Sequence, residues 1–572
     1  MVDLPSLRDL VERQIWREKI DSLPRRLVRL ARVADRIGLV AEPHLERLPA
    51  LAWLALRRGV GVRTIHAIHA LRTPDRLALV DAHRSLTYRE LEAEIAALAA
   101  GLSARLGVGR GTPVVLMSDN RAEYLVTWQA LTRLGARAIH ASYRMRPAEL
   151  RYVLDHSNAR IALVSEASHE AAASCQRDEP ERNLRLLLAS SALPTGAGAL
   201  RWEELLQPSA SPPADAAVRT LETESVVYTS GTTGRPKGAV RDFARYGAIE
   251  LSRVLERLAF RQGDRHLVVS PLYHSGAQAF VLIQTALGAT LYLEPHFEAE
   301  PTLSALSRHA IHSVFLVPTM IRRILELGPE LFLANPTPEL RGIVSGAAEF
   351  PTALREAAIR RFGAAHIFDF YGATELGWVT LIDGTEMLAH PGSVGRALAG
   401  QEIAIFDRDG RTLPVGETGL VYVRNEQTMS GYLHDRKASD ETRRGEWVTV
   451  EDLGYLDRDG YLFLAGRARD MVISGGVNIY PTEIEEVLAR HPSIREVAVI
   501  GVPDEEWGER LVAVVVPRAD GFDAAEVEEW ARAELAGAKV PRRWELVSEL
   551  PRNPTGKVLK TELRARFAPP AR

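Results

Sequence analysis

The sequence has almost no cysteine, no excess of one charge and no long hydrophobic run. Cys175 is its single cysteine, so the chain forms no internal disulfide and offers no cysteine-rich zinc site. Lysine and arginine number 71 against 74 aspartates and glutamates, and this balance gives no sign of a nucleic-acid partner. The longest early apolar stretch, residues 48–56, is far shorter than the ~20 residues of a membrane span. We therefore expect a cytoplasmic protein.

Two further absences narrow the class of protein. The sequence contains no GxSxG nucleophile elbow, which excludes an α/β-hydrolase. Its first ten residues carry charges and no continuous apolar run, so no signal peptide is predicted. With 46% hydrophobic and 25% charged residues, the 572-residue chain has an ordinary globular composition and enough length for several domains.

Residues 1–62 are predicted to form a helical basic N-terminal extension. Apolar residues recur at helical spacing between positions 27 and 37, and four arginines occupy roughly the opposite face, namely Arg25, Arg29, Arg32 and Arg36. Two interpretations stay open. The helix packs on the next domain with its arginines in water, or it contacts an anionic membrane surface on the cytoplasmic side.

The rest of the chain predicts an α/β fold in two parts. Residues 63–466 alternate short apolar β-type runs, such as 114–117, 161–164, 266–270 and 314–317, with helical runs, which indicates a large domain of helix-covered β-sheets. Residues 193–217 are rich in Pro, Gly, Ser and Ala and predict a surface loop. Residues 467–572 repeat the alternation on a smaller scale, which predicts a small C-terminal α/β domain.

The segment with the strongest functional signal is 228–238, Tyr-Thr-Ser-Gly-Thr-Thr-Gly-Arg-Pro-Lys-Gly, which follows a β-type run. Glycines let backbone N–H groups curl around an anion, hydroxyls donate to phosphate oxygens, and a lysine adds a point charge. The pattern differs from the common P-loop, because Pro236 stands where that loop has glycine. The predicted phosphate-binding residues are Thr229, Ser230, Gly231, Thr232, Thr233, Gly234 and Lys237.

This loop resembles the phosphate loop of the adenylate-forming superfamily, which includes acyl-CoA synthetases, peptide-synthetase adenylation domains and beetle luciferase. The resemblance runs from about residue 75 to 565. Residues 371–375, Tyr-Gly-Ala-Thr-Glu, resemble its second signature. It implies that Tyr371 stacks on adenine beside Gly372, Thr374 donates to a phosphate, and Glu375 holds Mg²⁺ as a hard oxygen ligand.

Further motifs fall in the family order. Residues 345–349 resemble a wall of the adenine and acyl site, with small residues at Gly346, Ala347 and Ala348; a plain tight turn is the alternative. The resemblance implies that Asp452 accepts hydrogen bonds from the ribose and that Arg467 contacts ribose and phosphate. Residues 450–452 read Val-Glu-Asp where the family usually has Thr-Gly-Asp, so the local backbone shape is uncertain while the carboxylate is kept.

The remaining motifs concern the small domain. Arg469 falls at the family's interdomain hinge, where Asp or Lys is usual, and it is either the pivot or a solvated linker charge. Gly475 and Gly476 belong to the loop that, in the family, lies along the pantetheine arm. Residues 551–557 match the motif of the catalytic lysine, which assigns that role to Lys557.

The acyl pocket is the least defined part of the resemblance. His274, within residues 271–276, falls at the pocket mouth, where it either gates access or is a buried histidine. Small residues at Gly346, Ala347, Ala348 and Gly377 predict room for a long chain, whereas Trp378 would narrow the pocket for a shorter or aromatic acid. The motifs together most resemble bacterial medium- and long-chain fatty acyl-CoA synthetases.

The resemblance implies a ligase that uses ATP, Mg²⁺ and coenzyme A. A carboxylic acid, expected to be a fatty acid, forms acyl-AMP and pyrophosphate, and coenzyme A then displaces AMP. Three alternatives remain: loading of a carrier-protein phosphopantetheine, an adenylate-dependent oxygenase, or a catalytically silent acyl- or nucleotide-binding protein. The expected partners are small molecules, and the chain is a monomer or a homodimer.

Overall fold

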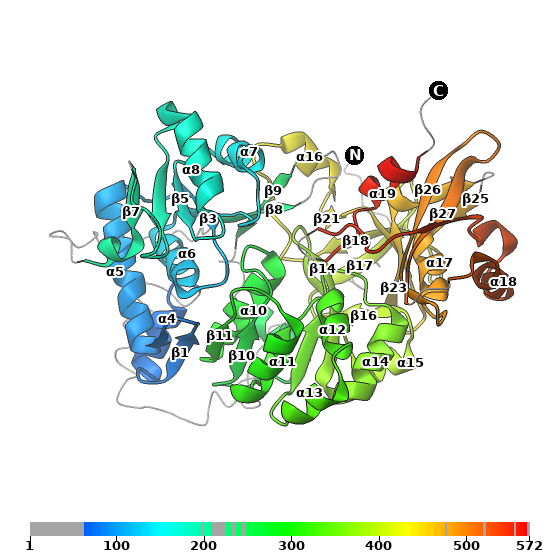
Figure 1. Ribbon diagram of the computed structural model, residues 1–572, viewed down its shortest axis with the longest axis horizontal. Helices are drawn as coiled ribbons and strands as arrows, with labels where there is room; N and C mark the ends of the chain where they lie inside the picture. The colour runs from blue at the N-terminus through cyan, green and yellow to red at the C-terminus, as the bar shows by residue number, and fades with distance from the viewer. Residues whose placement is uncertain are drawn as a thin grey trace, which may run out of the picture.

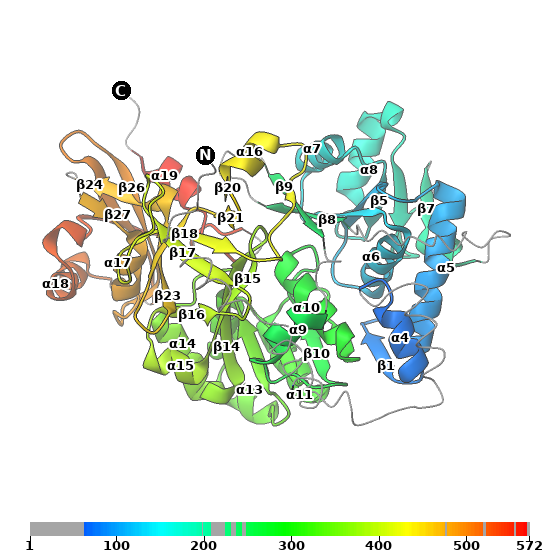
Figure 2. The ribbon, with the colours of Figure 1, turned by 180° about the vertical axis from the view of Figure 1, so that it is seen from behind.

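The fold is described here from a computed structural model (Figures 1 and 2). The structure describes residues 62–196, 198–207, 224–229, 236–242, 248–474, 477–518, 522–553 and 556–568. Of the N-terminal extension before these ranges, it describes Arg32 alone, which is helical and exposed, so the predicted basic helix otherwise lies outside the described residues. No helix in the described ranges is long and apolar enough to cross a membrane.

The first half of the large domain is built on an eight-stranded sheet. Its order, with bounds, is β19 (Gly431–Tyr432), β9 (Lys237–Asp242), β8 (Glu224–Thr229), β4 (Arg137–His140), β3 (Pro113–Met117), β5 (Ile161–Val164), β6 (Arg185–Leu188) and β7 (Ala199–Arg201). The strands from β8 to β7 are parallel, and β9 and β19 are antiparallel additions. Every residue of β5 is buried, as expected for a parallel strand covered on both faces.

Helices pack against this sheet and against one another (Figure 1). They are α4 (Ile65–Arg72), α5 (Tyr88–Leu106), α6 (Ala122–Leu134), α7 (Pro147–Ser157) and α8 (His169–Asp178). Helix α5 begins at a capping box between Thr87 and Glu90 and ends at Gly107, whose φ of 65° favours glycine. Local sequence signals therefore set both ends of the longest of these helices.

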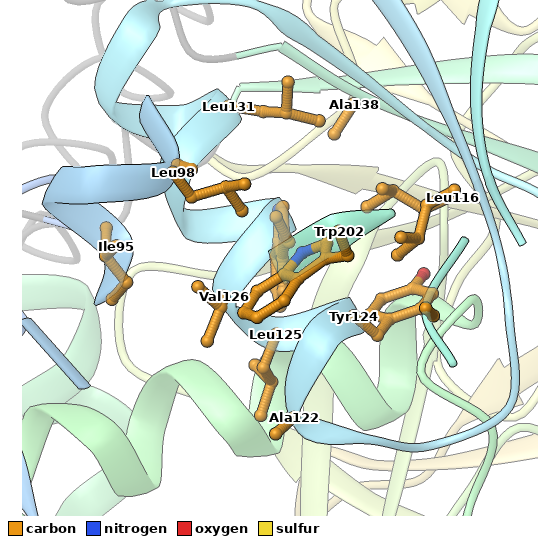
Figure 3. Packing of buried hydrophobic residues seen from close by; sticks show 14 of the residues in the cluster. Ile95, Leu98, Leu116, Ala122, Tyr124, Leu125, Val126, Leu131, Ala138 and Trp202 are labelled. Atoms are coloured by element: carbon orange, nitrogen blue, oxygen red, sulfur yellow. The ribbon is translucent and has the colours of Figure 1, made fainter. Parts of the chain in front are cut away.

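The core beneath α5 and α6 includes a residue that the sequence analysis placed on the surface. Trp202 is 1% exposed, lies among leucines and valines (Figure 3), and donates from Nε1 to Thr127 Oγ1 at 2.9 Å. The predicted surface loop at 193–217 is thus wrong for residues 199–206, which form β7 and the 3₁₀ turn Trp202–Leu206; residues 208–217 lie outside the described ranges. Burying the large Trp202 side chain favours an ordered segment here, although the surrounding composition is typical of a loop.

The second half of the large domain is built on a fifteen-stranded sheet. Its path is β2 (Ser85–Thr87), β1 (Leu77–Val80), β11 (Thr290–Leu293), β10 (Arg265–Val268), β12 (Ser313–Phe315), β13 (Gly342–Ser345), β14 (Ile367–Ala373), β15 (Gly377–Asp383), β16 (Ser393–Ala397), β23 (Tyr461–Arg467), β22 (Asp452–Leu456), β18 (Gly419–Arg424), β21 (Trp447–Val448) and β20 (Arg443–Arg444), with β17 (Glu402–Phe406) paired to β18. The run from β1 to β14 is parallel, and the strands from β14 to β20 pair antiparallel.

Helices cover the parallel part of this sheet, as Figure 2 shows from behind. They are α9 (Ala248–Leu255), α10 (Ser275–Ala286), α11 (Ala299–Arg308), α12 (Pro318–Leu325), α13 (Pro329–Ala334), α14 (Thr352–Phe362) and α15 (Gly384–Ala389), while α16 (Arg436–Glu441) follows β19. The predicted strands at 266–270 and 314–317 are β10 and β12, so these apolar runs were identified with ends shifted by one or two residues.

The C-terminal part is a small five-stranded sheet with three helices, orange and red in Figure 1. Its strands are β25 (Val477–Ile479), β24 (Val472–Ser474), β27 (Gly508–Pro517), β26 (Ile494–Asp504) and β28 (Arg543–Leu546), and its helices are α17 (Pro481–Leu488), α18 (Ala524–Glu534) and α19 (Lys560–Phe567). Strand β23 ends at Arg467 in the large sheet and β24 begins at Val472 in the small one, with a 3₁₀ turn at Ala468–Asp470 between them.

Candidate active site

A cavity of about 500 Å³ lies where the two large sheets meet the C-terminal domain. Its walls come from segments far apart in the sequence: the hairpin of β8 and β9, the start of α10, the end of β14, the β19 strand and the loop that carries Lys557. A second cavity of about 320 Å³ adjoins it between the large domain and α17, and both are lined by Gly372, Arg467 and Lys557. The motifs predicted separately are therefore brought to one place.

Side chains gather around Glu375 at the end of the cavity that is predicted to bind phosphates, the phosphate end. Glu375 is 8% exposed, and its carboxylate accepts a hydrogen bond from the Tyr432 hydroxyl at 3.0 Å. The Met429 backbone N–H donates to the Glu375 carbonyl at 2.8 Å. Lys237 Nζ lies 5.2 Å from the centre of the Tyr432 ring. Tyr432 thus contacts Lys237 through its ring and Glu375 through its hydroxyl.

Part of the predicted phosphate loop lies outside the described residues. Thr229 ends β8 and pairs with Lys237 at the start of β9, so the loop joins the two strands of a hairpin. The intervening predicted residues, Ser230, Gly231, Thr232, Thr233 and Gly234, lie outside the described ranges, as do Gly475 and Gly476 of the small domain.

Thr374 is held from two sides. Its hydroxyl is 2.9 Å from Ser275 Oγ at the start of α10, and its backbone carbonyl accepts a hydrogen bond from Arg241 Nη1 at 2.5 Å. Arg241 lies on β9, is 4% exposed and lines the cavity. The sequence analysis missed Arg241. Its signal was an arginine four residues after Lys237 in the same β-type run, and therefore on the same side of the strand because side chains alternate.

The end of the site that is predicted to bind the nucleoside is organised around Asp452. The Tyr371 hydroxyl donates to Asp452 Oδ2 at 2.9 Å, and Arg467 Nε lies 3.2 Å from Asp452 Oδ1. Asp452 and Arg467 are direct partners in the β22–β23 ladder. Glu451, where the family usually has glycine, adopts a φ of 63°, so the chain keeps the left-handed conformation with a non-glycine residue. The unusual Val-Glu-Asp sequence therefore still presents its carboxylate to the site.

The segment after β13 provides the neighbouring wall. Ala347 has a φ of 65° and lines both cavities, and Ala348 lines the second. Gly372 lies against β15, where a Cβ would meet the Gly377 carbonyl oxygen at 2.2 Å. The close approach of these two strands explains why glycine stands at position 372.

Lys557 lies at the junction of the two cavities. Its backbone N–H donates to Asn553 Oδ1 at 2.9 Å, within a tight turn. Burial lowers the pKa of the Lys557 ammonium to about 7; the positive charge of Arg467 lowers it too, and Asp452 raises it. This lysine is therefore close to half-protonated at neutral pH.

This pKa makes a pH dependence testable. We expect the kcat/KM for ATP in adenylate formation to fall as pH rises through about 7, because the charged ammonium is the form that offsets phosphate charge. The charge of Arg469 also lowers the Lys557 pKa. Arg469→Gln should raise it and move the fall to higher pH, whereas Arg408→Gln, at an exposed position after β17, should not. A profile unchanged by Arg469→Gln would contradict this assignment.

The small domain is docked with Lys557 facing inward. Arg322 on α12 donates to the Arg495 carbonyl at 2.8 Å, and Thr352 Oγ1 at the start of α14 lies 3.1 Å from Glu486 Oε2 on α17. Arg469 is an exposed residue of the 3₁₀ turn between the two sheets. These contacts hold the lysine loop against the large domain.

The far end of the cavity is aromatic. The rings of Phe370 and Trp378 stack with centroids 4.5 Å apart, and those of Phe280 and Phe315 stack at 4.9 Å. Phe315, Phe370 and Trp378 line the cavity, and Phe280 lies behind them, 5.0 Å from the Trp378 ring. This group of four rings, the aromatic cluster, closes the end of the cavity.

Two of the glycines that were predicted to leave space for an acyl chain lie against neighbouring side chains. A Cβ on Gly346 would meet the Phe370 ring at 2.5 Å, and one on Gly377 would meet the Gln427 side chain at 2.7 Å. Gly346 makes space for Phe370, and Gly377, with a φ of 78°, makes space for Gln427. These two glycines therefore accommodate neighbouring side chains, and the space for a long acyl chain stays a prediction.

His274 lines the cavity next to this cluster. Burial lowers the pKa of its imidazole to about 3, so the ring is neutral at physiological pH. Its Nε2 is buried without a hydrogen-bond partner among the described residues. The histidine is half-buried at the cavity wall, and its gating of access stays a prediction.

Residues 67–433 match the model of the AMP-binding enzyme family, and residues 483–557 match that of the AMP-binding enzyme C-terminal domain. This chain belongs to the AMP-binding enzyme family. Feruloyl-CoA synthase from Amycolatopsis sp is 34% identical over 89% of this chain and all of that protein. 2-Succinylbenzoate–CoA ligase from Geobacillus kaustophilus is 32% identical over 86% of this chain and 96% of that protein. The chain is an AMP-forming acid–CoA ligase of this family, which binds ATP and ligates an acid to coenzyme A through acyl-AMP.

Solved structures of this family share the fold. An anthranilate CoA ligase bound to anthranoyl-AMP has a TM-score of 0.80 and 28% identity, covering 89% of this chain and 97% of that one. ATP-bound MatB from Rhodopseudomonas palustris has a TM-score of 0.79 and 27% identity, covering 89% and 99%. A fatty acyl CoA synthetase from Mycobacterium tuberculosis has a TM-score of 0.69 and 29% identity, covering 89% and 98%. The predicted fold is confirmed, and the relatives are not specifically enzymes of fatty acids.

Proposed function

We propose that this enzyme activates a compact aromatic carboxylic acid to its coenzyme A thioester. The observation that carries the proposal is the aromatic cluster: Phe315, Phe370 and Trp378 close the cavity with flat apolar faces, which suit a ring better than a long flexible chain. The relatives named for feruloyl and succinylbenzoate substrates support this choice. A medium- or long-chain fatty acid is the alternative that the experiment below decides.

In the first step, a carboxylate oxygen of the acid attacks the α-phosphorus of ATP, the bond to the β-phosphate oxygen breaks, and pyrophosphate leaves. Two anions must approach, so the site has to offset negative charge. Lys557 would bridge the carboxylate and the α-phosphate, and Lys237 with the loop hydroxyls would hold the β- and γ-phosphates. Asp452 would accept from the ribose hydroxyls, and Tyr371 would flank the adenine.

The residues present fit a Mg²⁺ ion bound together with ATP. In the described part of the chain, no three His, Cys, Asp or Glu side chains gather into a metal site. Mg²⁺ in nucleotide sites is commonly held by one or two carboxylates plus phosphate oxygens, and Glu375 is a carboxylate in the right place. When bound, the ion would neutralise phosphate charge. The Tyr432 hydroxyl donates to the Glu375 carboxylate and restrains its orientation.

In the second step, the coenzyme A sulfur attacks the acyl carbon and AMP leaves with the electron pair of the acyl–oxygen bond. Lys557 occupies the site where this attack would occur, so the small domain must first move away. We place the pivot at Arg469, in the turn between β23 and β24. Gly475 and Gly476 would then line the path of the pantetheine arm. One mobile domain serves both half-reactions.

The first test is pyrophosphate release with ATP and Mg²⁺ across benzoates, phenylpropenoates and straight-chain acids up to C18, with and without coenzyme A. We expect the highest kcat/KM for an aromatic acid, with aryl-CoA as product. Preference for C12–C18 acids would replace the aromatic proposal by the fatty-acid one. Acyl-AMP that accumulates despite coenzyme A would indicate a carrier-protein acceptor, and no turnover on any acid would favour a binding protein.

A variant of the aromatic cluster tests the same point. Trp378→Leu removes a ring that lines the cavity and should shift the ratio of kcat/KM for aliphatic over aromatic acids upward by about tenfold, a usual size for one apolar pocket change. Phe260→Leu is the matched control, because Phe260 packs in the same hydrophobic cluster without lining the cavity. An equal ratio in both variants would show that the cluster does not select the acid.

A further inference from the structure

Arg241 is a buried cation that none of the roles above uses. It is 4% exposed on β9, in a strand whose neighbouring Ala239 and Val240 are also buried. Burying a guanidinium costs far more than burying an apolar side chain of similar size. An arginine in this position therefore needs a reason beyond packing.

The contacts of Arg241 point to the phosphate end of the cavity. Its Nη1 donates to the carbonyl of Thr374, which is 133 residues away in sequence, at 2.5 Å. Burial lowers the pKa of its guanidinium to about 10, and the negative charge of Glu375 acts in the opposite direction. The guanidinium thus lies under the turn that presents both the Thr374 hydroxyl and the Glu375 carboxylate.

The neighbour of Arg241 across the β8–β9 ladder is polar and uncharged. On β8 its direct ladder partner is Ser225, whose Oγ lies 3.3 Å from His140 Nε2. Burial lowers the pKa of His140 to about 3, so that ring carries no charge at neutral pH. The negative charge of Glu375 acts on Arg241, and Arg241 lines the cavity, so its guanidinium and the Glu375 carboxylate belong to the same end of the site.

We propose that Arg241 is a positioning residue for the adenylation step, which holds the Thr374–Glu375 turn toward the β- and γ-phosphates of ATP and adds a fixed positive charge there. Ser275 and Tyr432 restrain the side chains of Thr374 and Glu375, and Arg241 restrains the backbone between them. Lys237 and Arg241 lie on the same side of β9 and both line the cavity, so two cations face this end of the site.

The role predicts a selective effect. Pyrophosphate leaves after the first step, so Arg241 should matter for a nucleotide with β- and γ-phosphates and not for AMP. It should likewise matter for adenylation and not for thioester formation from ready-made acyl-AMP. A purely structural arginine would affect both ligands and both half-reactions alike.

The experiment compares Arg241→Met and Arg241→Lys with the wild type. Calorimetry with Mg²⁺ and a non-hydrolysable ATP analogue, and separately with AMP, needs no knowledge of the acid. For Arg241→Met we expect at least about tenfold weaker binding of the analogue, with AMP binding changed by less than about twofold. Arg241→Lys keeps the charge without the planar fork and should lose less. Melting temperatures of both variants are measured alongside.

Each outcome decides the proposal. Selective weakening of the analogue supports it, and equal weakening of both ligands, or of neither, contradicts it. If Arg241→Met does not fold, the same comparison on Arg241→Lys applies, with a smaller selective loss expected. The inference rests on the proposed adenylation activity, but the two fail separately: inactivity of the wild type on every acid would contradict the proposed function and leave the binding comparison intact.

Discussion

Lys557→Ala is expected to slow acyl-AMP formation by about 10²–10³-fold, the usual cost of removing one preorganised donor to a developing charge. The Lys557 ammonium lies beside Asp452 and Arg467. Arg467 is already paired with Asp452 at 3.2 Å, so we expect it not to replace the charge of the lysine. Thioester formation from synthetic acyl-AMP and coenzyme A should stay within about twofold, because the lysine has to leave before that step. Single-turnover assays of each half-reaction measure the two effects separately.

Lys539→Ala is the matched control for this variant. Lys539 is also in the small domain and pairs with Glu483 at 2.6 Å, away from both cavities. It should change neither half-reaction, since exposed ion pairs contribute little to stability. Equal losses of Lys557→Ala in both half-reactions would mean that the substitution disturbs the domain rather than the chemistry. Full activity of Lys557→Ala would favour a binding protein or a different catalytic group.

Glu375→Gln is expected to reduce kcat/KM for Mg·ATP by about 10²-fold and to move the Mg²⁺ dependence of adenylation to higher concentration. The amide keeps the size of the side chain, and its oxygen can still accept the Tyr432 hydroxyl, so the loss reports the missing charge. The measurement is the initial rate of pyrophosphate release against total Mg²⁺ at fixed ATP.

Tyr432→Phe separates orientation from charge at the same carboxylate. It removes the 3.0 Å hydrogen bond to Glu375 and leaves the carboxylate in place, so we expect a loss of about tenfold or less, with nearly unchanged Mg²⁺ dependence. An unaltered Mg²⁺ dependence in Glu375→Gln would rule out this glutamate as the metal ligand.

Short apolar runs in the sequence correctly predicted several buried strands, because the pattern that identifies such a strand lies within a few residues. The apolar run at 161–164 is β5, and the run at 114–117 is β3 with one more residue at its start. Such strands are buried on both faces, so hydrophobicity alone identifies them. The prediction of a surface loop was wrong for residues 199–206 because the partners that bury Trp202 are distant in sequence. One of them, Thr127, lies 75 residues away.

The signature motifs predicted more of the site than hydrophobic periodicity did. They pointed to Lys237, Glu375, Asp452 and Lys557 as one site, and the fold brings these residues to adjoining cavities. The motifs said nothing of Arg241, because its partner is a backbone carbonyl 133 residues away. They also gave no sign that Glu451 would adopt a φ of 63° to keep Asp452 in place.

The sequence by itself predicted a two-part α/β fold and a phosphate-binding loop, because both depend on short local segments. The adenylation of an acid followed from the resemblance of its motifs to the adenylate-forming superfamily. The shape of the acyl pocket could not be concluded in this way. Gly346 and Gly377 suggested open space, yet Phe370 and Gln427 fill it from elsewhere in the fold. Whether a small residue leaves a cavity or admits a neighbouring side chain depends on close packing between distant segments, which the tertiary structure alone specifies.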